Sequence, residues 1–363
     1  MPDAQAQIQK QLDQLVNEDR ECGLQVAAYH KGKLITDACA GHTDASRNTP
    51  VNARTLFPLF SCGKGATATM VHRLVARGIL DYDRPIATWW PEFAANGKHA
   101  ITLRHALDHT AGLPYLPPET DLTKLCDWDA MCSAIARLAP AWTPGTRSEY
   151  HAITFGWIVG ETACRATKLS FQQLLKQEIL TPLGLRDFFI GLPETEETRV
   201  AQLENATPLA PLPPPPPPGQ LEAIPHWLFP LSHWMNRPDI HRACIPASNG
   251  IMTARDLARH YAALIPGGVD GVELLPPASL RRILESNTEG HGFGYARGRA
   301  DSAMGSARPT CFGHGGHGGS LGFADPDHHL SVAFACNRLH TSDSGESRRK
   351  IIKTIRQILH AED

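Results

Sequence analysis

The chain has 363 residues, of which 42% are hydrophobic and 20% charged, a composition that suits a water-soluble globular protein large enough for two lobes. A formal net charge of -2 without any basic run lacks the electrostatic pattern of nucleic-acid or anionic-membrane binding, so we expect neither partner. Without a signal peptide, a run of transmembrane length or a C-x-x-C pair among nine cysteines, the sequence predicts a cytoplasmic protein with free thiols.

The first predicted elements are a helix and a β-hairpin. The helix ends before Gly23 and has an apolar stripe made of Ile8, Leu12, Leu15 and Val16. Residues 24–29 and 34–40 then have the pattern of two strands, joined by a short turn at 31–33. A helix and a hairpin thus precede the first motif that indicates chemistry.

The next predicted helix runs from Lys64 to a C-terminal cap at Gly78, with Ser61 at its first turn. Residues three apart share a helix face, so the Lys64 amine can reach the Ser61 hydroxyl, and the free N–H groups of the first turn point the same way. A nucleophile, a nearby amine and oriented donors are what serine acyl transfer requires. Alone, S-x-x-K is weak, because a capping serine and a solvated lysine give the same pattern.

The middle of the chain predicts two more helices. Thr102 is expected to cap the first, which should end near Gly112 and in which Asp108 and His109 could be catalytic partners. We favour a structural role for this histidine, packed beneath a loop, because Lys64 already occupies the face of the serine. Tyr150 stands at a junction between a loop and the second helix, whose apolar stripe consists of Phe155, Ile158, Val159 and Thr162.

Residues 206–219 are proline-rich, and an exposed polyproline spacer is favoured over a segment that binds an aromatic groove. The aromatic residues that follow form either a lid over an apolar acyl pocket or part of the core, and they include Trp227, Phe229 and Trp234. Gly250, before a helix capped by Thr253, is expected to adopt an unusual backbone angle.

Strand periodicity returns near the end of the chain, at 320–324 and 330–336, and a helix with one apolar face follows. With strands at both ends and helices between them, one sheet assembled from the two termini and an inserted helical lobe are predicted. We expect residues 1–60 and 290–363 to form the α/β lobe and residues 61–289 the mainly helical one.

Three motifs stand out by their order and spacing, which are Ser61-Cys62-Gly63-Lys64, Tyr150 and Phe312-Gly313-His314-Gly315-Gly316. With these motifs the chain resembles, over most of residues 8–360, the penicillin-recognising serine enzymes of the class C β-lactamase-like family, and is closest in character to family VIII carboxylesterases. This resemblance implies an α/β (α+β) fold of the β-lactamase/DD-peptidase type, with an antiparallel sheet flanked by the terminal helices, an all-helical lobe and the site between them.

The resemblance also implies roles for the motif residues. Ser61 is the acylated nucleophile, Lys64 the cation that lowers the proton affinity of its neighbours, and Tyr150 the group that takes the serine proton and returns it to the leaving group. An unperturbed phenol, with a pKa of about 10, needs such an ammonium nearby to act as a base. The amides of Ser61 and His317, the latter just after His314-Gly315-Gly316, would form the oxyanion hole.

Two departures from the family pattern weaken the case for β-lactam turnover. Ala152 stands where lactam and peptide enzymes usually carry the asparagine of Y-x-N, so a side-chain amide for the substrate is absent. His314-Gly315-Gly316 replaces K-T-G, which resembles D-aminopeptidases and some esterase-like members. With an unperturbed pKa, this histidine would make substrate binding sensitive to pH near 6.5. The expected cytoplasmic location also argues against assigning the chain as a cell-wall peptidase.

Two rival interpretations concern other residues. Gly318-Gly319-Ser320-Leu321-Gly322 matches the G-x-S-x-G elbow of α/β-hydrolases, but that elbow leads from a strand into a helix and needs a further domain after it. We therefore assign these glycines to a bend entering a strand. A metal site is also disfavoured, because no carboxylate or cysteine lies at ligand spacing from the crowded histidines, which are His314, His317, His328, His329 and His340.

The first functional hypothesis is a cytoplasmic serine carboxylesterase that acts on a small-molecule ester or acyl substrate through an acyl-enzyme on Ser61, without cofactor or metal. The alternative is an acyltransferase, transesterase or amide-forming enzyme that uses the same acyl-enzyme. It differs from the esterase in that its site would exclude water, so that the acyl group passes to an alcohol or amine. A β-lactamase or D-aminopeptidase is less favoured. A non-catalytic binding protein that docks through its proline run is the least favoured. The sequence indicates no oligomeric state.

Overall fold

The computed structural model describes residues 4–206, 214, 217, 221–285, 291–340 and 345–362. The chain begins with helix α1 (Ala4–Asn17) and the hairpin β1 (Gly23–His30) and β2 (Lys33–Gly41), as predicted. The prediction for the proline-rich segment 206–219 falls mostly outside the described residues.

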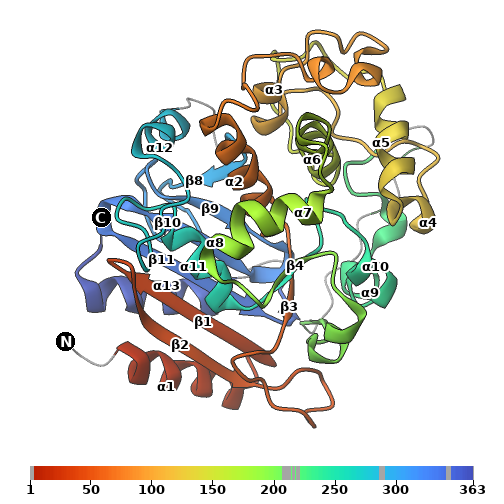
Figure 1. Cartoon of the computed structure of the whole chain (residues 1–363). Helices are drawn as coiled ribbons and strands as arrows, with labels where there is room; N and C mark the ends of the chain where they lie inside the picture. The colour runs from red at the N-terminus through yellow and green to blue at the C-terminus, as the bar shows by residue number, and fades with distance from the viewer. Residues whose placement is uncertain are drawn as a thin grey trace.

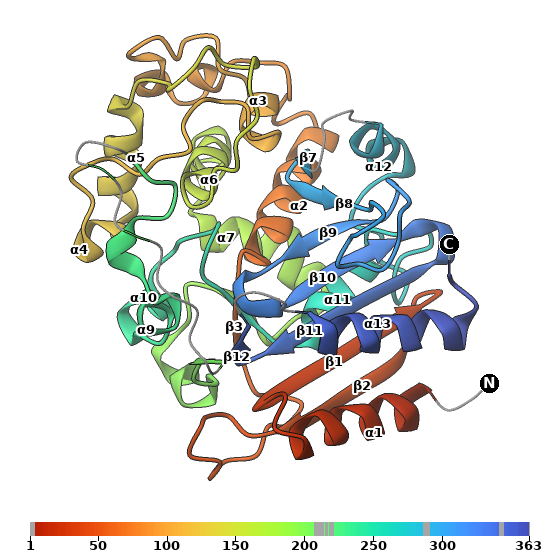
Figure 2. The same cartoon turned by 180° about the vertical axis from the view of Figure 1, so that it is seen from behind.

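The main sheet has seven antiparallel strands in the order β2-β1-β11-β10-β9-β8-β7 (Figure 1; β7 is labelled in Figure 2). Its C-terminal strands are β7 (His291–Gly292), β8 (Tyr295–Arg297), β9 (Phe312–Gly315), β10 (Leu321–Asp325) and β11 (Leu330–Cys336). Strand β1 from the start of the chain pairs with β11 from its end, with Val26 opposite Phe334. One sheet is therefore assembled from both termini, as the strand periodicity predicts.

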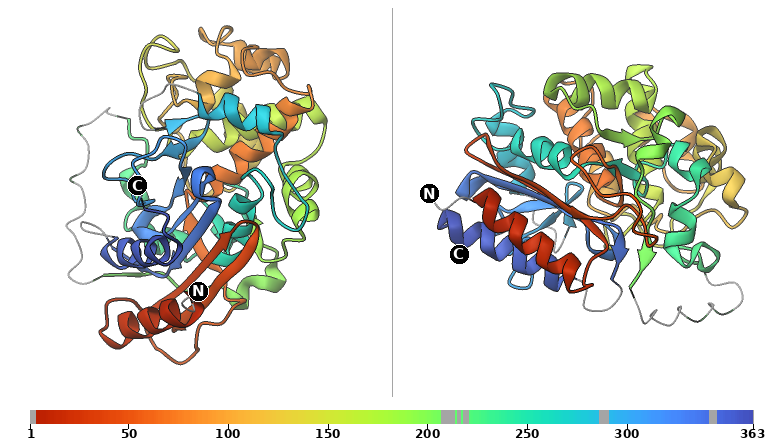
Figure 3. Two further views of the ribbon diagram at one scale, coloured as in Figure 1. Left: turned by 90° about the vertical axis from the view of Figure 1, so that its left-hand side faces the viewer. Right: turned by 90° about the horizontal axis from the view of Figure 1, so that it is seen from below.

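Alternate residues of the central strands enter two different cores. Val26 and Val332 pack against the apolar faces of α1 and the last helix, α13 (Glu346–Leu359). These two helices lie side by side on one face of the sheet (Figures 2 and 3). Helix α11 (Ala254–Ala262) covers the other face, where the Ser331 hydroxyl donates to the Ala258 carbonyl at 2.8 Å.

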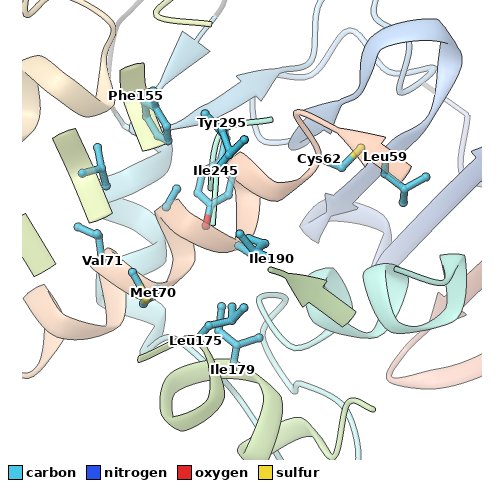
Figure 4. Packing of buried hydrophobic residues seen from close by; sticks show 14 of the residues in the cluster. Leu59, Cys62, Met70, Val71, Phe155, Leu175, Ile179, Ile190, Ile245 and Tyr295 are labelled. Atoms are coloured by element: carbon cyan, nitrogen blue, oxygen red, sulfur yellow. The ribbon is translucent and has the colours of Figure 1, made fainter. Parts of the chain in front are cut away.

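The second core is mainly helical and centres on α2 (Gly63–Ala76) and α6 (Thr154–Thr167), which pack against each other. Figure 4 shows Met70 and Val71 of α2 among other buried apolar side chains of this core. The remaining helices are α3 (Leu103–Leu107), α4 (Leu122–Leu125), α5 (Trp128–Arg137), α7 (Phe171–Leu175), α8 (Thr181–Leu183), α9 (Leu231–Met235), α10 (Pro238–Arg242) and α12 (Pro277–Leu284).

A small sheet fixes the start of α2. Its strands are β3 (Phe57–Phe60), β6 (Gly250–Met252) and β4 (Phe188–Ile190), in the order β3-β6-β4, and β5 (Glu204–Asn205) pairs separately with β12 (Arg338–Leu339). The predicted unusual angle of Gly250 is wrong, because this residue is an ordinary strand residue without positive φ. A Cβ atom there would lie 3.0 Å from the Gly63 nitrogen, so close approach explains the glycine instead.

Two further expectations have mixed outcomes. Thr102 caps α3 as predicted, but this helix ends at Leu107 because His109, two residues on, has a left-handed φ of 58°. Trp234 is buried, whereas Trp227 is 46% exposed, so the aromatic segment contributes to the core and also reaches the surface.

The proposed limits of the two lobes, 1–60 with 290–363 and 61–289, stay a prediction. Helix α11 comes from the middle range and yet packs on the sheet. None of the helices in the described ranges combines the length and the hydropathy needed to cross a membrane.

Candidate active site

Ser61 lies between β3 and α2, one residue before the helix N-cap Cys62 rather than within the first turn. The preceding residue, Phe60, has a left-handed φ of 48°, which residues other than glycine rarely adopt. Pairing of β3 with β6 and the edge-on contact of the Phe60 ring with His317, at 5.5 Å between centroids, surround this backbone. Strained backbone held in place by its neighbours is a feature of functional sites.

The Lys64 side chain is fully buried and has three oxygen neighbours. Its Nζ lies 3.1 Å from Ser61 Oγ, 2.6 Å from the Ala152 carbonyl oxygen and 2.7 Å from the Ala247 carbonyl oxygen. Burial holds the pKa of Lys64 well below its usual range, because a charged amine loses its hydration there. A neutral amine can donate to both carbonyls and keep its lone pair for the serine.

Tyr150 completes the contact that the sequence predicts. Its side chain interacts with that of Ser61, and Lys64 Nζ lies 4.7 Å from the centre of its ring. Burial raises the pKa of Tyr150, and the interaction with Ser61 opposes this shift. Tyr150, which is distant in the chain, therefore meets the Ser61 hydroxyl group beside Lys64.

His314 lies on β9 with its side chain 4% exposed. Its Nδ1 is 2.7 Å from the Gly315 carbonyl oxygen, whereas its buried Nε2 has no hydrogen-bond partner among the described residues. Burial, the Lys64 amine and the His291 ring hold the pKa of His314 well below its usual range. The pH sensitivity near 6.5 is expected only for an unperturbed pKa, and this lowered pKa does not meet that condition.

The residues after His314 run beside the serine turn. A Cβ atom on Gly316 would lie 2.1 Å from the Leu59 carbonyl oxygen, so only glycine allows this close approach. The Cys62 thiol also donates to the carbonyl of His314, at 3.4 Å. Within the described part of the chain, the amide N–H groups of Ser61 and His317 donate to no protein acceptor. Both donors are available to a ligand.

Several histidines surround Tyr150, and sequence analysis missed His291 among them. The ring of His109 lies 4.9 Å from the Tyr150 ring and that of His291 lies 5.3 Å from it, between centroids. The favoured structural role of His109 agrees with its 1% exposure and its acceptance of the His151 N–H, and Asp108 accepts the N–H of Phe293. The sequence gives no signal for His291, because its strand has only two residues and so shows no alternation of apolar and polar side chains.

The alternative nucleophile Ser320 is 2% exposed, and its hydroxyl oxygen accepts the Cys336 N–H at 3.3 Å. It follows a 3-10 turn, His317–Gly319, and precedes strand β10, which is the reverse of a strand-to-helix elbow. The described residues also contain no group of three or more histidine, cysteine or acidic side chains placed to hold a metal ion.

Comparison with known proteins agrees with the motifs. The family described as Beta-lactamase matches residues 8–356. The esterase/beta-lactamase LipL of Mycobacterium tuberculosis is 32% identical over 333 residues, which are 86% of this chain and 76% of that protein. Esterase EstB of Burkholderia gladioli is 30% identical, but the match spans 54% of this chain and 53% of EstB.

Solved structures give the same picture over nearly the whole chain. A family VIII carboxylesterase superposes with a TM-score of 0.85 at 28% identity, covering 98% of both chains. A penicillin-binding protein homolog from Caulobacter crescentus has a TM-score of 0.84 at 34% identity, covering 97% of this chain and 96% of that one. The chain therefore belongs to the β-lactamase family and is a serine hydrolase whose relatives include carboxylesterases.

Proposed function

We propose that this enzyme hydrolyses small-molecule carboxylic esters through an acyl-enzyme on Ser61. The observation that carries the proposal is the contact of one serine hydroxyl with both a buried amine, Lys64, and a half-buried phenol, Tyr150. A serine activated by an adjacent base is the usual nucleophile of acyl transfer. The esterase relatives support the choice of an ester as substrate.

The pKa shifts favour one direction of proton transfer. Burial lowers the pKa of Lys64 and raises that of Tyr150, and both shifts favour the uncharged forms, a neutral amine and a neutral phenol. Lys64 is therefore the base in this proposal, whereas the family resemblance implies that Tyr150 takes the serine proton. In this state Lys64 accepts the Ser61 proton while Ser61 Oγ bonds to the acyl carbon. The alcohol oxygen then leaves and receives a proton through the Tyr150 hydroxyl, which regains it from the Lys64 ammonium. Water then attacks the acyl carbon of the acyl-enzyme, and its proton passes through the Tyr150 hydroxyl to the Lys64 amine. The bond between the acyl carbon and Ser61 Oγ breaks, and the Lys64 ammonium returns the proton to Ser61 as the acid is released.

The oxyanion that forms on the acyl carbonyl needs hydrogen-bond donors. The amides of Ser61 and His317 are the proposed donors, because neither is used within the described part of the protein. The close approach of Gly316 to Leu59 keeps the His317 amide near the serine turn, and His314 is proposed to contact substrate beside Tyr150.

The same site favours an ester over a lactam. Ala152 offers a methyl group where family members have an amide, and its carbonyl is already bonded to Lys64. A neutral His314 also supplies no fixed positive charge for a substrate carboxylate. Transfer of the acyl group to an alcohol or amine would use the same intermediate, and product partition with an added acceptor measures it. A cytoplasmic location, which cell fractionation would check, remains part of this proposal.

The test is a pre-steady-state assay with 4-nitrophenyl butyrate. We expect a burst of nitrophenol close to one equivalent of enzyme, and a butyryl adduct on the Ser61 peptide by mass spectrometry. Ser61→Ala should abolish both, whereas Ser320→Ala should keep both. A burst that survives Ser61→Ala and disappears in Ser320→Ala would refute the proposal.

A further inference from the structure

His291 occupies the edge of the main sheet beside the proposed catalytic phenol. It lies on β7, the last strand of the sheet order, next to β8 (Figure 2). Its ring is 5.3 Å from the Tyr150 ring and 6.0 Å from the His314 ring, between centroids. Two imidazoles from different strands therefore flank the group that would protonate the departing alcohol.

Unlike the other histidines here, His291 is half-buried and can still meet a ligand. Neither of its ring nitrogens has a hydrogen-bond partner among the described residues, and the buried Nε2 of His314 also lacks one. His151 is different, because its Nδ1 bonds to the Glu149 carbonyl and its Nε2 accepts the Leu113 N–H. Buried polar groups are normally paired, so the unpaired Nε2 of His314 is free to bind a substrate atom, and the half-buried His291 ring lies beside it.

The charge state of His291 limits which ligand fits. Burial, with Lys64 and Arg299 as further causes, lowers its pKa to about 4, so the ring is neutral at pH 7. A neutral imidazole has one N–H donor and one lone pair, which together match a hydroxyl group. The neutral imidazoles of His291 and His314 therefore suit an uncharged oxygen as their hydrogen-bond partner.

We propose that His291 is a substrate-binding residue that hydrogen-bonds a second, uncharged oxygen on the alcohol part of the ester. The inference rests on the proposed function, because the alcohol part is placed beside Tyr150 only if Tyr150 protonates the departing oxygen. Monoesters of diols and of other polyols are the substrate class that carries such an oxygen.

The test compares two esters that differ by one hydroxyl, ethyl butyrate and 2-hydroxyethyl butyrate, by titration of released acid. One hydrogen bond to an uncharged group changes binding by roughly three- to tenfold, so we expect wild-type kcat/KM to favour the hydroxylated ester by that factor. His291→Phe keeps a ring beside Tyr150 and should bring the ratio close to one, mainly through KM. His291→Asn, which keeps a donor and an acceptor, should restore part of the preference.

The ratio of kcat/KM for the two esters distinguishes a loss of substrate binding from general damage to the enzyme, because such damage lowers both kcat/KM values equally. His233→Phe, at an exposed position on α9, is the matched control and should leave both rates unchanged. If His291→Phe does not fold, His291→Leu gives the same comparison. A wild-type enzyme without the preference, or one whose preference survives in His291→Phe, would overturn this inference while leaving the esterase proposal intact. Failure of both esters together with no Ser61 adduct would instead remove the proposed function, and this inference with it.

Discussion

Acidification should destabilise this protein through His151, which is fully buried next to the proposed catalytic tyrosine. Burial lowers its pKa to about 4, whereas the unfolded chain has the ordinary value of about 6.5. The unfolded state therefore binds more protons between these values, so stability is complete above pH 6.5 and falls as the pH approaches 4. Linkage gives a loss of about 2 kcal/mol between pH 7 and pH 5 for this one group.

The measurement is urea unfolding at pH 7 and pH 5, followed by the fluorescence of the seven tryptophans. His151→Gln removes the titrating ring, while the other buried histidines titrate alike in both proteins and cancel. With a slope of about 3 kcal/mol per molar urea, the wild-type midpoint should fall by roughly 0.7 M more than that of the variant. Equal falls in the two proteins would refute the claim that His151 is buried in its neutral form.

Three further predictions concern the site. Lys64→Met removes the amine at similar length and should lower kcat for 4-nitrophenyl butyrate by about 10²- to 10⁴-fold, and retention of wild-type kcat would exclude Lys64 as the base. In the wild-type enzyme kcat/KM should fall towards acid pH as the Lys64 amine becomes protonated, and a rate that rises there would contradict the assigned proton transfer. Gly316→Ala would place a methyl group 2.1 Å from the Leu59 oxygen, so both Tm and kcat should decrease, the latter by about a hundredfold; unchanged values would mean that the backbone moves aside.

Local sequence pattern predicted those parts of the fold that depend on neighbours in the chain. The hairpin of β1 and β2, the Thr102 cap and the helix after Tyr150 follow from periodicity and capping. The spacing between Ser61 and Lys64 likewise fixed their proximity, because the turn entering α2 brings these residues together.

The features that could not be predicted from the sequence depend on contacts between residues distant in the chain. The small sheet of β3, β6 and β4 joins short segments distant in the chain, and no periodicity reveals such pairing. The lowered pKa of His314 follows from burial among groups contributed by other elements. His291 escaped notice for the same reason, since only the folded sheet brings it beside Tyr150.

The pairing of β1 with β11 has a consequence for synthesis of the protein. Leu24 lies opposite Cys336, so a ribosome must add 312 residues (336 minus 24) before these partners coexist. At 5 to 20 residues per second this takes about 16 to 60 s, during which the apolar strand β1 has no β11 to pair with. The nascent hairpin is thus a candidate client for chaperones that shield unpaired strands, and circular permutants that make β11 before β1 should depend on such help less.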